Sequence, residues 1–356
     1  MDDSTVSVGR NLGTDPRLFG KTNLVSTDSM RVLVTGATGF LGNNLCRTLI
    51  QQGHQPMAAV RSVSDLRPLD GIAVETVTLD FESASDISVA LDSVDAIVHS
   101  AAMIHLGWTK LDACRKVNVD NTIRIAQVAR RKNIRMIFVS SVDALGMASP
   151  ENIGTEDRLD PPKPPNNYVV TKREAETAFL LEVADGLDGI IVNPGFLIGP
   201  YDWKPSSGEM MLLIYNNFIF FVPGGGCSVV DVRDVATGIA SAIENGQTGQ
   251  RYILAGENMS YFDLWDRMAK AMKCGGPKRK MRDGFAKVIG GVCDLFGKVT
   301  GKEFDLNSGM LQMGQLHHYY SSDKAIAELG YKINDVDDAI ADAFDWFVAN
   351  EYVKKK

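Results

Sequence analysis

The chain has 356 residues, of which 45% are hydrophobic and 23% charged, and its formal net charge is -7. This size and composition predict a globular protein with one large hydrophobic core or two unequal ones. The negative balance argues against a nucleic-acid partner, and the basic runs 278–280 and 354–356 are interpreted as solvated. No window reaches the ~20 apolar residues that a transmembrane span needs.

Residues 1–29 carry acidic side chains among Ser, Thr and Gly without an apolar core, so we expect a flexible leader rather than a targeting peptide. The five cysteines are odd in number and lack C-x-x-C spacing, which argues against a zinc site or a disulfide framework. We therefore expect no metal and a reducing, cytoplasmic location. The cysteines are Cys46, Cys114, Cys227, Cys274 and Cys293.

A glycine-rich turn at residues 35–42 follows the apolar run 32–34 and precedes a stretch with helical periodicity. Gly36 permits the tight turn, Gly39 lets the backbone approach a pyrophosphate, and Gly42 lets the helix pack on its strand. The helix N-terminus then offers free N–H groups to an anion. Strand, turn and helix together predict a dinucleotide site. The residues expected to contact the cofactor here are Gly36, Thr38, Gly39, Phe40, Leu41 and Gly42.

A second strand, residues 56–60, ends at Arg61. In dinucleotide-binding folds an acidic residue at this place hydrogen-bonds the ribose 2′-hydroxyl of NAD, whereas an arginine accommodates the 2′-phosphate of NADP. Arg61 therefore favours NADP, with NAD as the alternative.

Two further strands, residues 74–79 and 96–99, end in polar or small residues. Strands that alternate with helical stretches predict an α/β fold with a doubly wound parallel sheet, which binds ligands at the carboxyl ends of its strands. Asp80 is expected either to accept from an adenine amino group or to cap the next helix. The small side chains at 100–102 would let the cofactor lie against the backbone. The expected contacts are Asp80, Phe81, Ser100, Ala101 and Ala102.

A long helix over residues 111–132 leads to a fifth strand that runs into Ser141. A later helix opens with Tyr168 and Lys172, which share one face because they are four residues apart. A sixth strand ends around Pro194, which we expect at the cofactor edge. A tyrosine and a lysine at this spacing are common by chance, so the order of the glycine turn, the strand ending at Ser141 and this pair is the stronger evidence for a site.

Taken together, these motifs resemble an extended short-chain dehydrogenase/reductase of the epimerase/dehydratase superfamily, over about residues 30–352. Residues 194–200 resemble the Pro-Gly-x-x-x-Gly-Pro segment of this superfamily. The segments 230–236, 249–258 and 320–331 are similar to the branch that includes dihydroflavonol 4-reductases and hopanoid-associated sugar epimerases. We expect a Rossmann domain mainly in residues 30–195 and a smaller C-terminal α/β substrate domain mainly in 196–356, with some exchange of chain between them.

The resemblance implies that Ser141, Tyr168 and Lys172 are catalytic. Tyr168 would protonate the alkoxide left by hydride transfer, and the ammonium of Lys172 with the nicotinamide would lower its pKa from the reference value of ~10. Lys172 would also hold the nicotinamide ribose. Ser141 would hydrogen-bond the substrate oxygen. The hydride itself belongs to the cofactor.

Two departures from the resembled enzymes bear on the reaction. Sugar dehydratases of this kind have an Asp-Glu pair after the catalytic Thr, whereas only Asp143 is present here, and we interpret it as a turn or capping residue. UDP-sugar epimerases have an asparagine where this chain has Phe196, which favours an apolar substrate pocket. The apolar runs 210–215 and 218–221 fit such a pocket, but are interpreted first as core.

Other segments are expected around this pocket. A loop with His105 and Trp108 would overhang the nicotinamide, and residues 201–204 would form a second wall. The amphipathic stretch within 284–299 is expected to be buried over the substrate pocket, with a membrane surface or a partner as the alternative. The C-terminal helices are expected around 261–273, 284–299 and 335–349.

The sequence thus predicts an NADP-dependent oxidoreductase that reversibly reduces a ketone or aldehyde of a relatively apolar small molecule. The first alternative is a sugar or nucleotide-sugar epimerase, and the second is a non-catalytic dinucleotide-binding protein. The expected partner is a small carbonyl or alcohol substrate, and a homodimer is possible.

Overall fold

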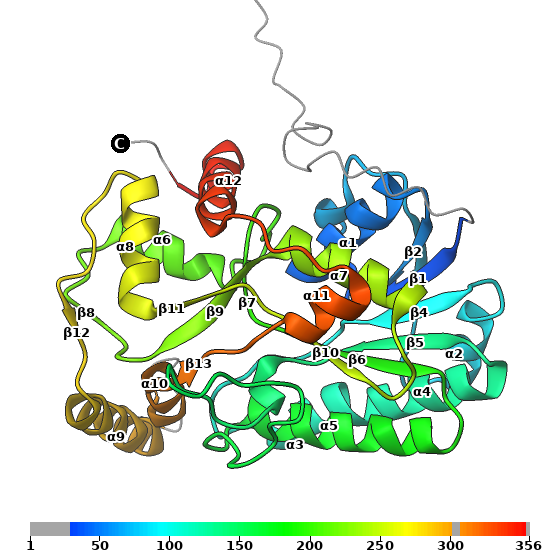
Figure 1. Ribbon diagram of the computed structural model, residues 1–356, viewed down its shortest axis with the longest axis horizontal. Helices are drawn as coiled ribbons and strands as arrows, with labels where there is room; N and C mark the ends of the chain where they lie inside the picture. Colours follow the sequence, from blue (N-terminus) through cyan, green and yellow to red (C-terminus); the bar gives the residue numbers. More distant parts are fainter. Residues whose placement is uncertain (1–28, 301–306, 354–356) are drawn as a thin grey trace, which may run out of the picture.

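A parallel sheet of seven strands forms the larger part of the computed structural model, which describes residues 29–300 and 307–353 (Figure 1). The predicted leader lies outside the described residues, except for Ser29. The strand order is β10-β6-β5-β4-β1-β2-β3, which confirms the doubly wound α/β fold. The strands are β1 (Arg31–Thr35), β2 (Gln55–Val60), β3 (Glu75–Thr78), β4 (Ala96–His99), β5 (Arg135–Val139), β6 (Gly189–Pro194) and β10 (Arg251–Leu254).

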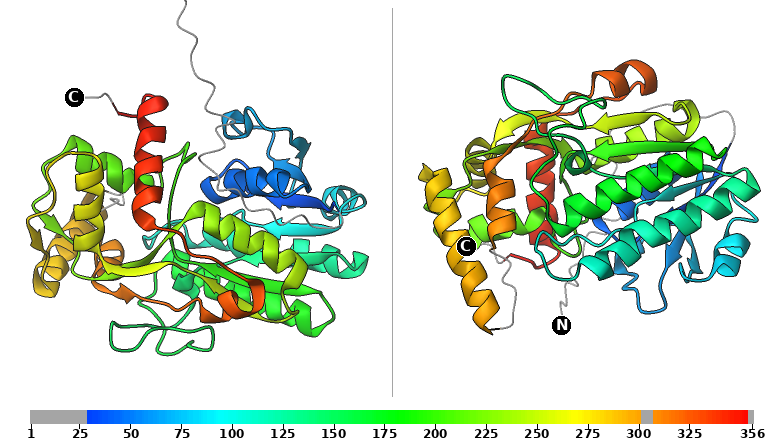
Figure 2. Two further views of the ribbon diagram at one scale, coloured as in Figure 1. Left: turned by 45° about the horizontal axis from the view of Figure 1, so that its top comes forward. Right: turned by 90° about the horizontal axis from the view of Figure 1, so that it is seen from below.

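Helices cover both faces of this sheet, as parallel strands that are apolar on both faces require. Val32, Leu33 and Val34 in the central strand β1 are accordingly without solvent exposure. One face carries α1 (Phe40–Gln51), α7 (Val232–Asn245) and α11 (Asp323–Leu329). The other carries α2 (Ala84–Ala90), α4 (Asn121–Lys132) and α5 (Asn167–Ala184), of which α4 and α5 lie side by side in Figure 2. The chain returns from its C-terminal half to supply β10, α7 and α11.

The helix predicted over 111–132 is interrupted. It consists of α3 (Leu111–Arg115), a π-helical turn η3 (Lys116–Asp120) and α4. Asn118 sits in this wider turn, and its side chain bonds the backbone N–H and carbonyl of Met103 at 2.7 and 2.9 Å. Such π-turns inside helices are frequent at functional sites.

The smaller part of the molecule has its own core between a four-stranded sheet and three helices. The sheet contains β7 (Phe196–Ile198), β9 (Gly226–Asp231), β11 (Glu257–Ser260) and β13 (His317–His318). The helices are α6 (Gly208–Asn216), α8 (Tyr261–Ala271) and α12 (Val336–Ala349). Met211, Trp265 and Phe347 lie in this core. The predicted helices near 261–273 and 335–349 are confirmed as α8 and α12.

A two-stranded ribbon and two helices complete the described chain: β8 (Phe221–Val222), β12 (Arg279–Lys280), α9 (Asp283–Thr300) and α10 (Ser308–Gln315). Short 3-10 turns lie at η2 (Arg67–Leu69) and η4 (Val142–Ala144). Helix α9 confirms the stretch predicted at 284–299. None of the helices within the described ranges is long and apolar enough to cross a membrane.

Side chains of α1 connect the two parts. The Asn43 and Asn44 amides donate to the carbonyl oxygens of Tyr201 and Pro200, both at 3.1 Å. The Arg47 guanidinium lies 3.9 Å from the centre of the Tyr201 ring. The helix that follows the glycine turn therefore also holds the start of the smaller part in place.

Candidate active site

The glycine turn is closed by backbone contacts that leave no room for side chains. Gly36 has a φ of 67°, and a Cβ there would lie 2.8 Å from the Ala101 nitrogen at the end of β4. A Cβ on Gly42 would lie 2.1 Å from the Gly36 carbonyl oxygen. These glycines are required by close packing of the turn, α1 and β4, as the sequence predicts.

The N-terminus of α1 has the features of an anion site. Gly39 is its N-cap, and among the described residues no side chain caps the helix and no acidic side chain lies in its first turn. The N–H groups near Thr38, Phe40 and Leu41 could therefore meet an anion with the positive end of the helix dipole behind them. The turn and the helix end fit the pyrophosphate of a dinucleotide.

Arg61 follows directly after β2, and Asp80 lies two residues after the end of β3; both are exposed at the carboxyl edge of the sheet. The Arg61 backbone N–H donates to the Ser64 hydroxyl at 2.9 Å. Among the described residues, however, the Arg61 guanidinium has no hydrogen-bond or ion-pair partner. The Asp80 carboxylate accepts from the Glu82 backbone N–H at 2.9 Å and so caps a turn. Arg61 is therefore free to meet a ligand, whereas Asp80 already has a local partner.

A buried hydrogen-bond network joins the ends of β1 and β4. His99 lies between the hydroxyls of Thr35 and Thr122, at 2.8 and 3.0 Å, and burial lowers the pKa of its imidazole to about 3. Ser100 donates to the Thr35 carbonyl at 2.7 Å, and the Ala101 N–H donates to the Thr35 hydroxyl at 3.2 Å. His99 is thus a neutral structural link that fixes the small residues of this edge.

Three other predicted cofactor contacts differ in what they can offer. The Phe81 ring packs edge-to-face on His99 at 6.2 Å, so its side chain belongs partly to the core. Ala102 is exposed, while Pro194 is buried at the end of β6. Phe81 and Pro194 can therefore contribute mainly backbone, and Ala102 a small open surface.

Ser141 and Tyr168 come together where β5 ends and α5 begins. A side-chain hydrogen bond with Ser141 lowers the Tyr168 pKa, but burial and then the Asp143 carboxylate outweigh it, so this pKa is raised above its usual value. The prediction that the Tyr168 pKa is lowered is therefore wrong for the effect of the protein's own residues, which raise it. Tyr168 is only half-buried, so its ring still borders open space. Its hydroxyl is protonated at neutral pH.

Lys172 is one turn further along α5 and almost fully buried. Its Nζ lies 5.9 Å from the centre of the Tyr168 ring and donates to the Val139 carbonyl at 2.9 Å. Burial lowers its pKa to about 8, while the Glu176 carboxylate acts in the opposite direction. The two residues predicted to share a helix face therefore do lie together.

Asp143 has a larger structural role than the predicted turn or cap. The Lys163 Nζ donates to its Oδ1 at 2.8 Å and also to the Val142 carbonyl, and the His318 Nδ1 lies 3.1 Å from the same Oδ1. Burial alone would raise the pKa of this carboxyl, but Lys163 and His318 hold it well below its usual range. A charged group thus lies near the Tyr168 hydroxyl. Within the described ranges, no three His, Cys, Asp or Glu side chains could hold a metal ion.

Two asparagines position these side chains. The Asn118 amide donates to the Thr171 hydroxyl at 2.9 Å, which connects the π-turn to α5. The Asn193 amide donates to the Ser141 carbonyl at 2.9 Å and to Glu176 at 2.7 Å. Neither was predicted as a site residue, because an asparagine within a helix or strand gives no signal by itself.

The second wall predicted at 201–204 is not supported for Tyr201 and Asp202, whose side chains are buried. Tyr201 is buried, and Trp203 packs edge-to-face on Trp346 at 5.1 Å in the smaller core. Asp202 is also buried and accepts from two backbone N–H groups at the start of α6. The loop with Trp108 is anchored beside the site, since the Asn167 N–H donates to the Gly107 carbonyl at 3.1 Å. Its closure over the nicotinamide stays a prediction.

The apolar runs of the smaller part divide between core and surface. Met211 and Ile214 are buried in its core, so the first interpretation of 210–215 is confirmed. Phe196 packs partly against the same core. The run 218–221 is divided: Ile219 packs partly against the core, whereas Phe218 is 74% exposed and Phe220 and Phe221 are also exposed.

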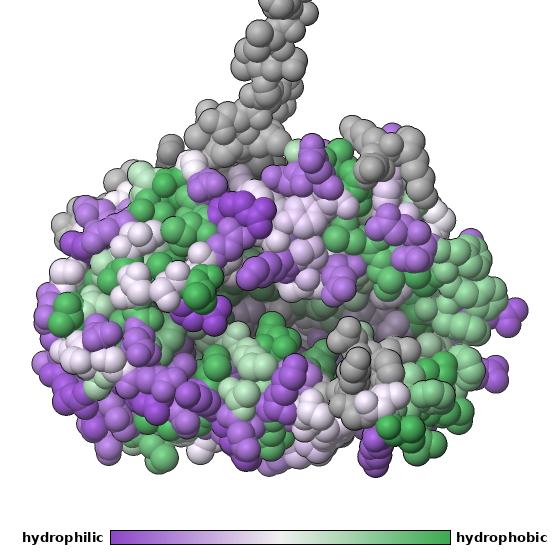
Figure 3. All heavy atoms as spheres, turned by 180° about the vertical axis from the view of Figure 1, so that it is seen from behind, coloured by the Kyte–Doolittle hydropathy of each residue, from purple (hydrophilic) through white to green (hydrophobic). Residues whose placement is uncertain are grey.

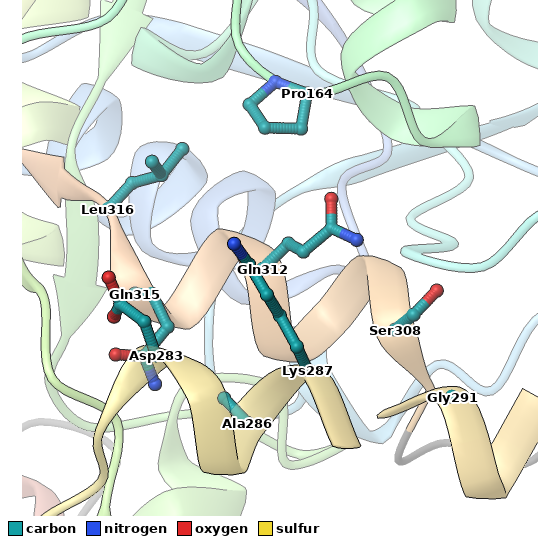
Figure 4. A pocket seen from close by; sticks show the side chains of 9 residues that line it. All are labelled: Pro164, Asp283, Ala286, Lys287, Gly291, Ser308, Gln312, Gln315 and Leu316. Carbon is teal, nitrogen blue, oxygen red and sulfur yellow. The ribbon is translucent and has the colours of Figure 1, made fainter. Parts of the chain in front are cut away.

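A cavity of about 360 Å³ lies between α9, α10 and the segment before α5 (Figure 4). Pro164 and Leu316 on its walls are close in sequence to Lys163 and His318, which hold Asp143. On α9, Ala286, Lys287 and Gly291 line it. The expected burial of α9 is wrong for its large apolar side chains, which lie on the outer side of the helix.

The Rossmann-type sheet, the uncapped helix after a glycine turn and the Ser-Tyr-Lys grouping are typical of a dinucleotide-dependent enzyme. Residues 32–255 match the NAD dependent epimerase/dehydratase family, and the chain belongs to this family. It is therefore an extended short-chain dehydrogenase/reductase, for which an NAD(P) dinucleotide is the typical cofactor.

Relatives of this chain include a Synechocystis sp. protein with the provisional name dihydroflavonol 4-reductase, 31% identical over 90% of this chain and 95% of its own. Sterol demethylase protein B of Methylococcus capsulatus is 36% identical over 64% of this chain and 70% of its own. The crystal structure of gox2253 is similar with a TM-score of 0.80 and 31% identity, covering 92% of this chain and 100% of that one.

Proposed function

We propose that this protein is an NADP(H)-dependent oxidoreductase that reversibly reduces a ketone or aldehyde of an apolar small molecule. The observation that carries the proposal is the grouping of Ser141, Tyr168 and Lys172 beside the carboxyl edge of the sheet. A protonated phenol next to a hydroxyl and an ammonium suits a reaction in which a carbonyl oxygen becomes an alcohol.

In this reaction a bound nicotinamide dinucleotide supplies the hydride to the carbonyl carbon. The Tyr168 hydroxyl donates its proton to the carbonyl oxygen, and the Ser141 hydroxyl holds that oxygen by a hydrogen bond. The buried Lys172 ammonium stabilises the phenolate that remains on Tyr168. Oxidation of the alcohol runs through the same steps in reverse.

Three observations support an apolar substrate. Phe196 occupies the place where the similar sugar epimerases have an asparagine. The cavity beside the Asp143 cluster has the apolar residues Pro164, Ala286 and Leu316 on its walls, together with polar and charged side chains that could meet the oxygen atoms of a substrate. The names of two relatives refer to dihydroflavonols, which have aromatic rings, and to sterols, which are largely apolar. The lone Asp143, without a following Glu, argues against dehydration.

A screen for NADPH oxidation tests this proposal. Aromatic aldehydes, dihydroflavonol-like ketones, 3-oxosteroids and UDP-sugars would each be added to the purified protein with NADPH, with absorbance followed at the nicotinamide band. We expect consumption with at least one apolar carbonyl. Epimerisation of a UDP-sugar without net consumption of NADPH would contradict the proposal and select the epimerase.

The cofactor preference is tested by Arg61→Asp. We expect this change to weaken NADPH binding by about 10- to 100-fold, because it replaces the cation that would meet the 2′-phosphate by a like charge. NADH binding should weaken far less. Titration of the cofactor fluorescence gives both affinities.

Arg131→Asp is the matched control for Arg61→Asp, because Arg131 is also exposed but lies near the C-terminus of α4, just before the amino end of β5. It should leave both affinities unchanged. A wild-type protein that binds NADH more tightly than NADPH would show that Arg61 does not select the cofactor.

The five free cysteines support the proposed cytoplasmic location, because thiols persist in a reducing compartment.

A further inference from the structure

Exposed apolar side chains are concentrated on one surface of this molecule. Nine of the twenty large apolar side chains that are exposed in the described part belong to residues 218–221 and the outer side of α9. Figure 3 shows them at the right-hand and lower right-hand edge. We call this surface the apolar face: Phe218, Phe220, Phe221, Phe285, Val288, Val292, Leu295, Phe296 and Val299. Scattered exposed apolar residues are ordinary, whereas a contiguous patch marks an interaction site.

Helix α9 is packed with its small residues inward. Ala286 and Gly290 are its buried residues, and a Cβ on Gly290 would lie 2.8 Å from the Ser308 Cα of α10. The large side chains recur at spacings of three and four, from Phe285 to Val299, and form the opposite stripe. A helix that served only the core would turn this stripe inward.

Aromatic contacts make the apolar face continuous from the 218–221 run to α9. The ring centres of Phe220 and Phe221 are 4.8 Å apart, and those of Phe221 and Phe285 are 5.5 Å apart. Strand β12 pairs with β8, so that Arg279 lies opposite Phe221, and its guanidinium lies 6.0 Å from the centre of the Phe220 ring. Basic side chains therefore border the aromatic end of this face.

The charge of this region is opposite to that of the whole chain. Residues 278–300 contain six basic and two acidic side chains, while the chain as a whole carries -7. Both acidic groups are engaged elsewhere: Asp294 accepts from the Ser308 N–H at 3.0 Å, and Asp283 lines the cavity. The basic residues 278–280 and Arg282 are exposed. Basic and aromatic side chains around an apolar stripe are the composition of a helix that lies in a membrane interface.

We propose that the apolar face docks onto a membrane surface that contains anionic lipid. The side chains of α9 and 218–221 enter the boundary between headgroups and acyl chains, and residues 278–282 meet the lipid phosphates. Docking is peripheral, because no helix in the described ranges can span a bilayer. A second copy of the chain fits this face less well, since a protein contact that covered the face would also take the basic side chains at its border out of water.

The inner side of the same helix lines the cavity beside the Asp143 cluster, through Ala286, Lys287 and Gly291. An apolar carbonyl substrate dissolved in the bilayer would thus reach the site past α9. This step rests on the proposed function, whereas the docking does not.

Co-sedimentation of the purified full-length protein with vesicles tests the docking. We expect binding to vesicles of phosphatidylcholine with one quarter phosphatidylglycerol, at least tenfold weaker binding to pure phosphatidylcholine, and a loss of binding in high salt. Val292→Glu with Leu295→Glu, and separately Arg279→Glu with Lys280→Glu, should each weaken binding to the mixed vesicles at least tenfold.

Leu181→Glu is the matched control, because Leu181 on α5 is 65% exposed and Leu295 is 62% exposed, but α5 lies away from the apolar face. It should bind like the wild type. Thermal unfolding and NADPH titration show that each variant is folded. Absence of vesicle binding, or a stable dimer in sedimentation that Val292→Glu with Leu295→Glu dissociates, would overturn the proposal. Neither result depends on turnover, so docking and the proposed reduction fail independently.

Discussion

The Tyr168→Phe variant is expected to lose about 10³-fold in kcat on the substrate that the screen identifies, which is the range of a positioned general acid. The hydroxyl is the group that gives the proton to the carbonyl oxygen, and its high pKa in the structure keeps it protonated at neutral pH. The phenyl ring keeps the packing beside Lys172. KM for the substrate and the affinity for NADPH should therefore change by less than about fivefold, because the lost interaction acts in the transition state.

Tyr331→Phe is a suitable control for this experiment. Tyr331 is buried, and its hydroxyl has no hydrogen-bond partner in the part of the chain that the structure describes. Removal of that hydroxyl should leave kcat unchanged and the free energy of unfolding equal or higher. A Tyr168→Phe protein with kcat within tenfold of the wild type would show that another group donates the proton.

The parts of the fold and site that the sequence predicts are those determined by local pattern. The strand before the glycine turn, the turn itself and the helix after it are adjacent in the chain, and Gly36 and Gly42 are dictated by the close packing of that unit. Tyr168 and Lys172 lie together because helical spacing alone places them on one face. Parallel strands that are apolar on both faces then fix the order of layers.

The Asp143 cluster could not be predicted in this way, because its members are distant in sequence. Lys163 lies in the loop before α5 and His318 in β13, and only the folded chain brings both to one carboxylate oxygen. From the sequence alone, an aspartate two residues after Ser141 is interpreted as a turn residue. The structure does contain such a turn, because the Asp143 backbone N–H donates to the Ser141 hydroxyl at 3.1 Å. The raised pKa of Tyr168 comes first from burial and then from the Asp143 carboxylate, and neither can be predicted from local pattern.

The orientation of α9 escaped prediction for a different reason. Helical periodicity identifies an apolar stripe, but it does not say whether that stripe faces the core. Gly290 and Ala286 allow α10 to approach closely, so the helix packs by its small residues. The basic run 278–280 looked separate from this helix in the sequence, yet β12 brings Arg279 against Phe220.

Lys172→Met is expected to abolish efficient turnover and at the same time to stabilise the cofactor-free protein. Lys172 is 2% exposed, and its pKa falls from 10.5 to about 8 because burial penalises the ammonium. That difference corresponds to roughly 3 kcal/mol of lost stability while the group is charged. The methionine variant also loses the hydrogen bond to Val139, which destabilises it by about 1 kcal/mol. The net effect of the substitution should be a free energy of unfolding that is higher by roughly 2 kcal/mol at pH 7.

The pH dependence gives this prediction its sharpest test. Below pH 8 both the folded and the unfolded chain carry the proton on Lys172, and the folded protein bears the whole penalty. Between pH 8 and 10.5 only the unfolded chain retains it, so the wild type gains stability as the pH rises and the advantage of Lys172→Met shrinks. Urea unfolding of both proteins without cofactor at pH 7 and pH 9.5 measures the two differences. A methionine variant with a lower free energy of unfolding than the wild type at pH 7 would contradict the prediction. It would show that the buried Lys172 ammonium stabilises the folded protein.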